Sequence, residues 1–355
     1  MTTIAPLTLR LTKAGTFGAT RRSFLHGSAL LGLGALAGSG FGRARAAGFP
    51  SRTIEVIVPT REGGGADRNL RAVTDVWSKY LEGAVFEPGF YPGASGRVGY
   101  EVYMGKREPN PHNLLFGNMG PEVLNWVVEP PESFQFPGDY KYFAHVDNDP
   151  SVVYVSADGP FQTIEDVVEE GKKRTLSVAV SRLAHPASLG VLALGEATGA
   201  KFNLIPFSGG RNTIAAVVTG ETDLGALPIA GVIERGDVLK VVLLFDDQNR
   251  FGDKLPDVPV VNEAFGTDLP PLVSSRAFAL HSATFEQYPE EVAMLQESLR
   301  QVFDDAQHKQ NIVETGAPAE VIAYGGIEEC EAYVENIIAI GDRFKPLLTG
   351  DTDEG

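Results

Sequence analysis

The chain has 355 residues, with 30 Lys and Arg against 46 Asp and Glu, which gives a formal net charge of −16 at pH 7. Nucleic acids and anionic membrane surfaces are bound by basic protein surfaces, so this acidic balance argues against both as partners. The single cysteine, Cys330, excludes an internal disulfide, and we expect it to be a buried structural thiol.

The first 46 residues have the features of an export signal. Arg21-Arg22 precedes Ser23-Phe24-Leu25, a Gly/Ala/Leu run follows, and Ala44-Arg45-Ala46 offers small residues at both positions of an A-x-A cleavage site. The apolar run is too short and too rich in glycine to span ~30 Å of hydrocarbon. We expect residues 1–46 to be a signal peptide for the twin-arginine route to the periplasm. Its removal takes six basic and no acidic residues from the charge of −16, which leaves −22.

Beyond Pro50 the chain alternates between strand and helix patterns. Residues 53–59 are typical of a buried strand, Gly63-Gly64-Gly65 interrupts it, and apolar side chains from Asp67 onward recur at the three- and four-residue spacing of a helix. Further strands are predicted at residues 151–155, 176–180, 202–206, 223–227, 239–245 and 277–280, and further helices at 187–198, after 208–210, and around 292–303 and 333–344. The alternation predicts an α/β protein with parallel sheets, in which ligands bind beyond the carboxyl ends of the strands.

Thr163 and Asp166 form a variant of the capping box, with aspartate at the position where glutamate is usual. In this arrangement each side chain accepts a hydrogen bond from the backbone N–H of the other residue. The pair therefore predicts the start of another helix at this point.

Three strand-to-helix turns offer backbone N–H groups with little side chain in the way. They span residues 60–67, 181–188 and 207–211, and Arg61, Arg68, Arg182 and Arg211 lie within or beside them. A helix N-terminus carries unpaired N–H donors and a partial positive charge, which suit an anion. Each turn alone is also explained by packing or capping, and Asp67 is equally explained as a helix-start residue that accepts local N–H groups. Three such turns in one exported chain favour a ligand site.

Sequence patterns of reactive chemistry are missing. Gly63-Gly64-Gly65 has neither the P-loop nor the dinucleotide-binding spacing, and residues 92–96 are not a nucleophile elbow. The histidines at 112, 145, 185, 281 and 308 are scattered singly, without metal-ligand spacing. His185 alone lies in a candidate turn, where it can equally cap local structure. We therefore expect neither an enzyme nor a bound metal or cofactor.

Six segments of the chain resemble, in order, segments of one known family. They are residues 49–67, Tyr91–Gly99 (Y-P-G-A-S-G-R-V-G), Asn113–Asn118 (N-L-L-F-G-N), Ile205–Gly210 (I-P-F-S-G-G), Gly220–Leu224 (G-E-T-D-L) and Leu255–Ala264 (L-P-D-V-P-V-V-N-E-A). The family is that of the substrate-binding receptors of tripartite tricarboxylate transporters, also called Bug-type solute-binding proteins.

The resemblance implies a two-lobed, periplasmic-binding-protein-like fold of type II, in which each lobe is a mostly parallel sheet flanked by helices. The first lobe would join residues 47–149 to 275–355, and the second would be residues 150–274. Family members capture small organic carboxylates between the lobes and pass them to a membrane permease. The resemblance thus implies a monomeric periplasmic receptor whose partners are a carboxylate and the permease subunits.

The resemblance also implies which residues surround the ligand. In the first lobe they are Thr60, Arg61, Gly63, Gly64, Gly65, Ala66, Asp67, Gly117, Asn118 and Met119, and in the second Ser181, Arg182, His185, Ser188, Phe207, Ser208, Gly209, Gly210, Leu227 and Pro228. Several departures from the family pattern leave the ligand open. Arg61-Glu62 replaces small or proline residues, Phe207-Ser208 replaces Tyr-Lys, and Arg182 and His185 stand in a turn that is usually small and polar.

Two other functions stay open at this point. A periplasmic sensor that signals to a membrane partner would use the same lobes and the same ligand site. An exported α/β enzyme is the third, and it lacks a recognisable catalytic constellation.

Overall fold

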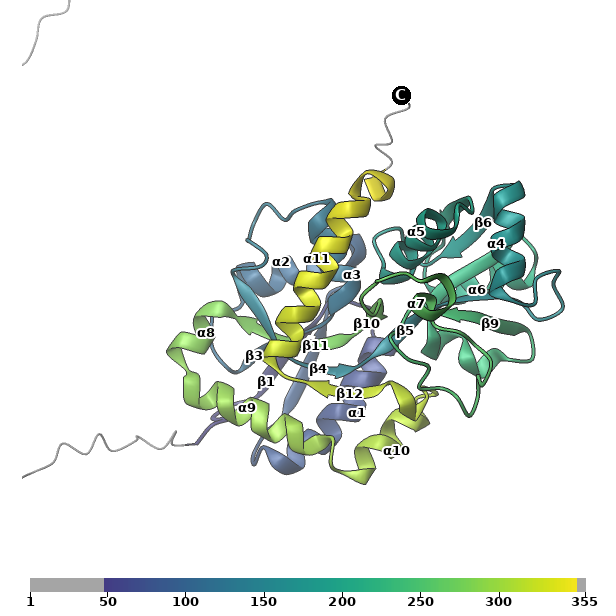
Figure 1. Ribbon diagram of the computed structural model, residues 1–355. Helices are drawn as coiled ribbons and strands as arrows, with labels where there is room; N and C mark the ends of the chain where they lie inside the picture. The colour runs from purple at the N-terminus through teal and green to yellow at the C-terminus, as the bar shows by residue number, and fades with distance from the viewer. Residues whose placement is uncertain (1–47, 350–355) are drawn as a thin grey trace, which may run out of the picture. The chain divides into compact units, whose positions relative to one another are not determined.

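The computed structural model of the protein describes residues 48–349, in which two six-stranded sheets are each flanked by helices (Figure 1). The predicted signal peptide, residues 1–46, and the last six residues lie outside this range. Among the helices of residues 48–349, none combines the length and the apolar character needed to cross a membrane.

The first sheet has the strand order β12-β4-β11-β3-β1-β2. Its strands are β1 (Ile54–Val58), β2 (Phe86–Phe90), β3 (Asn113–Asn118), β4 (Tyr140–Asp147), β11 (Arg276–His281) and β12 (Ile322–Gly325). The chain segments around it form α1 (Gly65–Tyr80), η1 (Ala94–Gly96), α2 (Arg97–Lys106), α3 (Met119–Val128), α8 (Ser282–Gln287), α9 (Pro289–Val302), α10 (Ala306–Glu314), η4 (Ala319–Val321) and α11 (Ile327–Thr349). We call this sheet and these helices the first lobe.

The second sheet has the order β10-β5-β8-β6-β7, and β9 pairs with β5 outside this path. Its strands are β5 (Asp149–Ser156), β6 (Leu176–Val180), β7 (Phe202–Pro206), β8 (Leu224–Pro228), β9 (Leu239–Leu244) and β10 (Val273–Ser274). Its helices are α4 (Ile164–Lys173), α5 (Pro186–Thr198), α6 (Gly210–Val218), η2 (Ile229–Gly231), η3 (Ile233–Arg235) and α7 (Val261–Phe265). We call this sheet and these helices the second lobe.

The predicted α/β architecture is confirmed, but the sheets are mixed rather than mostly parallel. Only β1, β2 and β3 in the first sheet, and β6, β7 and β8 in the second, pair in parallel. The remaining pairs are antiparallel because the chain runs from β4 straight into β5 and returns from β10 into β11. A strand that begins at the edge where its neighbours end must run in the opposite direction to them.

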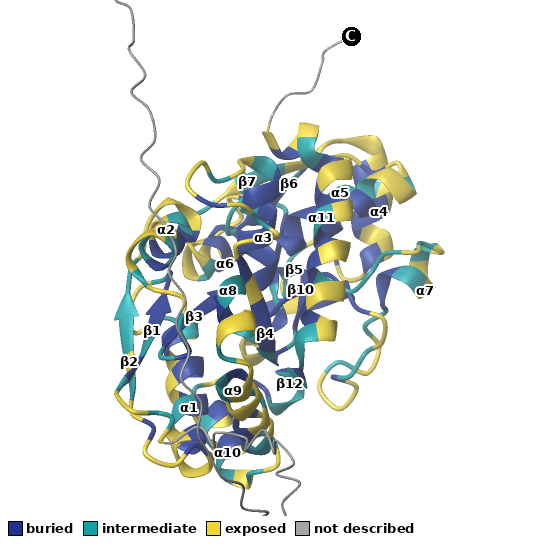
Figure 2. Ribbon diagram, turned by 90° about the vertical axis from the view of Figure 1, so that its left-hand side faces the viewer, coloured by how far each residue is buried: buried dark blue, intermediate teal, exposed yellow. Residues whose placement is uncertain are grey.

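The core of the first lobe is built on aromatic side chains between the sheet and its helices. Trp77 of α1 is fully buried, stacks on Phe86 with ring centroids 4.7 Å apart, and donates a hydrogen bond from Nε1 to Ser298 Oγ at 2.8 Å. The donor of the buried indole is therefore satisfied, as burial of a polar atom requires. Figure 2 shows the buried strands between helices whose outer faces are exposed.

The register of the strands places the ends of all six parallel strands at the junction between the lobes. Asn118, the last residue of β3, pairs with Arg276, the first residue of β11. In the second sheet Pro228, the last residue of β8, pairs with Ser151 near the start of β5. Because the chain crosses between the lobes at these same edges, the turns that follow the parallel strands of both lobes lie at one junction.

The predicted capping box at the start of α4 is confirmed. Thr163 Oγ1 accepts a hydrogen bond from Asp166 N at 3.2 Å, and Thr163 N donates one to Asp166 Oδ2 at 3.0 Å. Both bonds satisfy N–H groups that a helix N-terminus would otherwise leave unpaired.

Replacing Thr163 with alanine should lower the free energy of unfolding by about 1 kcal/mol, because one N–H of α4 loses its acceptor. The measurement is the urea midpoint of the variant against the wild-type protein. Thr163→Ser keeps the hydroxyl and is the control, with a midpoint close to that of the wild type. Equal midpoints for all three proteins would contradict the capping role.

Candidate functional site

The turn between β1 and α1 holds the first predicted set of ligand residues. Gly63 has φ +74°, a left-handed conformation that favours glycine, and its N–H donates to Asp67 Oδ2 at 2.7 Å. Asp67 Oδ1 accepts from Arg71 Nε at 2.6 Å, so both oxygens of this carboxylate are used locally. The N–H groups of Gly65, Ala66 and Asp67, in the first turn of α1, have no hydrogen-bond partner within residues 48–349.

The predicted residues after β3 attach the first lobe to the returning chain. Asn118 Oδ1 accepts a hydrogen bond from Ser274 Oγ at 2.9 Å, and Met119 N donates to Ser275 O at 2.7 Å. Gly117 leaves no room for a side chain, because the hydroxyl of Tyr100 occupies the position of a Cβ. This turn therefore fixes the position of α3 at the junction.

The turn between β6 and α5 is held together by its own side chains. His185 is buried at the N-cap of α5, and its Nδ1 accepts a hydrogen bond from Ala187 N at 3.1 Å. Burial, with the positive charge of Arg182 nearby, lowers the pKa of His185 to about 3. Ser188 donates from Oγ to Arg182 O at 2.9 Å. His185 and Ser188 thus shape this turn, and Ser181 lies half-buried beside it.

The turn after β7 presents further free donors. Gly209 has φ +81°, and its N–H bonds back to Phe207 O at 2.9 Å. In the first turn of α6 the N–H groups of Gly210, Arg211 and Asn212 have no partner in the part of the chain that the structure describes. A Cβ at Gly210 would lie 3.8 Å from Leu227 Cδ1, so α6 begins beside the end of β8, which Leu227 and Pro228 complete.

A hydrogen bond across the junction joins the two sets of turns. Arg182 Nη1 of the second lobe donates to Ser95 O of the first at 3.1 Å. Ser95 and its neighbour Ala94 have φ of 55° and 44°, which is uncommon for residues with a side chain. Ser95 was not among the predicted ligand residues, although the nearby Pro92-Gly93 is a turn signal.

A positive charge beside the free donors of α1 belongs to Arg276, which was not predicted. Its Nη2 lies 3.5 Å from the position that a Cβ would take at Gly65. Asp147 holds the guanidinium through a buried ion pair, and Arg276 N donates to Asp147 Oδ1 at 2.6 Å. Burial raises the pKa of the neighbouring Asp149 to about 7, although Arg276 opposes the shift.

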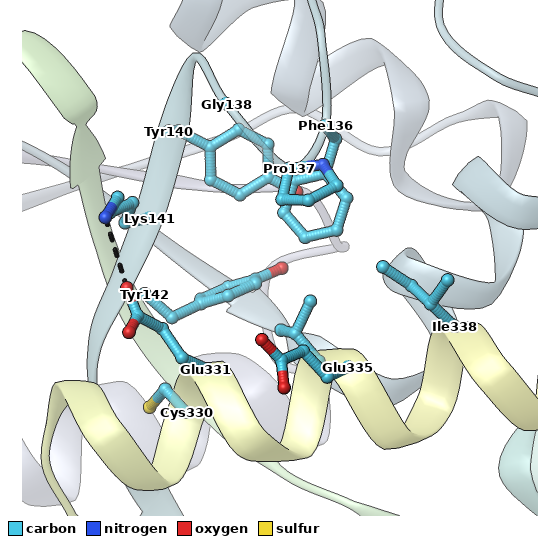
Figure 3. Close-up of a pocket in the computed structure, with 11 residues that line it drawn as sticks. Phe136, Pro137, Gly138, Tyr140, Lys141, Tyr142, Cys330, Glu331, Glu335 and Ile338 are labelled. Atoms are coloured by element: carbon cyan, nitrogen blue, oxygen red, sulfur yellow. Dashed lines mark hydrogen bonds and ion pairs between the residues drawn. The ribbon is translucent and has the colours of Figure 1, made fainter.

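Two hollows in the described residues lie at different places, one between the lobes and the other within the first lobe. A groove of about 810 Å³ lies between the lobes, between Arg68 of α1 and the segment Ala230–Arg235. A smaller cavity of about 380 Å³ lies between β4 and α11, where Phe136, Tyr140 and Tyr142 line it (Figure 3). Lys141 Nζ and Glu331 Oε1 form an ion pair of 3.1 Å at its side. None of the predicted ligand residues lines either of these two hollows.

The described residues offer no cluster of three or more His, Cys, Asp or Glu side chains that could hold a metal ion. Burial raises the pKa of the Cys330 thiol to about 12, as expected of a structural cysteine. The turns that hold the predicted ligand residues follow strands that end at the junction, and they offer backbone donors.

No family model matches the chain. Solved structures share its fold over most of its length. A TctC solute-binding protein from Polaromonas is 22% identical, with a TM-score of 0.68 over 86% of this chain and 100% of that one. The Rhodopseudomonas palustris protein Rpa4515 with adipate is 19% identical, with a TM-score of 0.69 over 85% of this chain and 99% of that one. MatC from the same organism, with bound malate, is 20% identical, with a TM-score of 0.64 over 84% of this chain and 100% of that one.

A curated relative in Bordetella bronchiseptica, described as a UPF0065 protein, is 24% identical over 223 residues. The match spans 62% of this chain and 65% of that protein. At these identities the likenesses establish the fold, which is that of two-lobed periplasmic binding proteins. The resemblance to the tripartite tricarboxylate transporter receptors is thereby confirmed at the level of the fold.

The buried His185 makes the stability of the protein depend on pH. Its pKa is about 3 in the folded protein and ~6.5 in an unfolded chain, so below pH 6.5 the unfolded state binds the proton more readily. Stability should therefore fall as the pH falls from 6.5 toward 3. His185→Asn keeps a cap acceptor but cannot titrate, so between pH 7 and pH 5 the wild type should lose about 2 kcal/mol more than the variant.

The measurement is chemical unfolding of both proteins at pH 5 and pH 7. His112→Asn, at a half-buried histidine of the first lobe, is the matched control and should keep most of the wild-type pH dependence. If His185→Asn loses as much stability on acidification as the wild type, the account of a neutral capping histidine is wrong.

Proposed function

We propose that the protein is a periplasmic substrate-binding receptor, which captures a small organic carboxylate between its lobes and delivers it to the membrane subunits of a tripartite tricarboxylate-type transporter. The predicted signal peptide would send the protein to the periplasm by the twin-arginine route. The receptor would act as a monomer. The malate and adipate in two structures of the same fold support a carboxylate as the ligand class.

One observation carries the proposal. The first turns of α1 and α6 belong to different lobes, lie at the same junction, and both present three N–H groups without a partner within residues 48–349. A carboxylate is an anion with four acceptor sites, which such donors suit. Arg276 beside Gly65 adds a fixed positive charge to the first of the two sites.

Two such sites on opposite lobes suit a ligand that has two carboxylates. One carboxylate would bind at Gly65–Asp67 and the other at Gly210–Asn212. A ligand held by both lobes stabilises the closed arrangement over the open one, since only the closed form offers both sets of donors. This difference is the signal that a permease would recognise.

The lobes that close are residues 47–149 with 275–355, and residues 150–274. The chain crosses between them twice, near Asp149 and near Ser274, and these crossings would be the hinge. We propose no catalytic role, because His185 is a neutral cap acceptor and the hydroxyl of Ser188 donates to a backbone oxygen rather than to a base.

A thermal-shift screen of the protein against mono-, di- and tricarboxylates, amino acids and sugars tests the function. A ligand at a hundred times its Kd stabilises the folded state by about 2.7 kcal/mol, which raises the unfolding midpoint by several degrees. We expect this shift from dicarboxylates and not from sugars. The proposal would be contradicted if only sugars raised the unfolding midpoint. It would also be contradicted if none of the acids raised the midpoint at any concentration.

The variant Gly210→Val tests whether the first turn of α6 is part of the ligand site. The structure has room for the new side chain, since the nearest atom to a Cβ at this position is 3.8 Å away, but the added methyl groups would stand before the free N–H groups of α6. The variant should keep the wild-type midpoint without ligand and lose the shift. Gly105→Val on the exposed side of α2, where a Cβ meets nothing within 4 Å, is the matched control and should keep the shift.

A further inference from the structure

Glu122, in the first turn of α3, places a carboxyl group inside the junction. Its side chain is 1% exposed. Its Oε1 lies 3.2 Å from the position that a Cβ would take at Gly96, and the side chain of Pro59 lies 3.5 Å from the same point. Pro59 leads into the turn of residues 60–67, so the carboxyl group lies beside Gly96, which follows the Ser95 that Arg182 contacts, and near the start of that turn.

One oxygen of the Glu122 carboxyl group lacks a partner, although hydrogen bonds from the backbone N–H groups of Glu122 and Asn118 to the carboxyl group act to lower its pKa. Its Oε2 is buried and has no hydrogen-bond partner among residues 48–349, and no ion pair in that range includes it. The two nearby arginines are engaged elsewhere, Arg182 by Ser95 O and Arg276 by Asp147. A buried polar atom without a partner is costly, and a ligand that supplies the partner recovers that cost.

Titratable groups face Glu122 from each of the surrounding elements. They are Arg182 before α5, Arg276 of β11, Tyr100 of α2, Tyr140 and Tyr142 of β4, and Tyr333 of α11. Burial raises the pKa of Glu122 to about 8, although Arg182, backbone N–H groups and Arg276 oppose the shift.

The tyrosines do not supply the missing partner. Tyr100 and Tyr142 share a hydrogen bond of 2.7 Å between their hydroxyl oxygens, and the hydroxyl of Tyr333 donates to Val273 O. At pH 7 Glu122 therefore carries an O–H that can donate.

We propose that Glu122 contacts the ligand of the proposed receptor site and donates a hydrogen bond from its carboxyl group to a carboxylate of the ligand. Hydrogen bonds from O–H to a carboxylate are among the shortest and strongest in proteins. The substrate class is then a dicarboxylate with no cationic group at this end, because an ammonium group would require Glu122 to be ionised. This inference rests on the proposed function.

Glu122→Gln tests it, because glutamine has nearly the same shape and keeps an N–H donor but cannot titrate. The Kd of malate and of adipate is measured by calorimetry at pH 7 and pH 9 for the wild type, for Glu122→Gln, and for Glu165→Gln as the control. Glu165 is exposed on α4, and the change of chemistry is the same. Asp149 titrates near pH 7 in all three proteins and cancels in the comparison.

With a pKa of about 8, the donor is lost from nine-tenths of the molecules at pH 9, so the wild type and Glu165→Gln should bind about tenfold more weakly there than at pH 7. Glu122→Gln should bind within a few-fold of the wild type at pH 7 and equally at both pH values. A wild type that binds equally at both pH values would overturn the inference. So would a Glu122→Gln variant that keeps the tenfold loss, or one that folds normally and loses all binding at pH 7.

Titrations with amino acids distinguish a neutral Glu122 from an ionised Glu122 that pairs with an ammonium group. If only ligands with an ammonium group bind and Glu122→Gln abolishes their binding, Glu122 is an ionised partner and the inference is wrong, while the receptor function stands. If the wild type binds no acid at either pH, the proposed function itself fails and the inference fails with it.

Discussion

The buried ion pair between Asp147 and Arg276 is the constraint on which the arrangement of the lobes depends. Asp147 ends β4 where the chain leaves the first lobe, and Arg276 begins β11 where the chain returns. Besides Arg276, the Asp147 carboxylate binds Asn69 Nδ2 at 3.3 Å, so the desolvated charge has the further hydrogen bonds that a buried pair needs. The pair holds the end of β4 to the start of β11, so the two crossings between the lobes lie side by side. The same guanidinium lies beside Gly65, so Arg276 both pairs with Asp147 and contributes positive charge to the proposed site.

An acidic protein that is proposed to bind an acid must supply local positive potential against its own net charge of −16. The structure does so mainly with backbone N–H groups, whose partial charges are fixed in place and cost no side-chain entropy on binding. Glycine at 65 and 210 leaves the first turns of α1 and α6 open to a ligand, as a larger residue would not. The neutral form of Glu122 fits the same requirement, because an ionised carboxylate there would repel the ligand.

Much of the fold could be predicted because periodicity reports the buried faces of long elements. The strands at 176–180 and 202–206 and the capping box of Thr163 lie where the sequence predicts them. The strand β2 (Phe86–Phe90) was missed, since it contains Pro88 and Gly89 and is only half-buried, and α3 was missed because nearly all its residues are buried and no stripe appears. The turns of the candidate site could be found from glycines at the ends of strands. Glu122, Arg276 and Ser95 could not, because their roles depend on partners from 30 to 129 positions away or from the other lobe.

The most direct test is a crystal structure of the protein grown with the dicarboxylate that gives the largest thermal shift. We expect one ligand at the junction, with one carboxylate within hydrogen-bond distance of the N–H groups of Gly65 and Ala66, and the other at Gly210 and Arg211. A ligand in the cavity beside Phe136 and Tyr142, or one held by a single lobe, would contradict it.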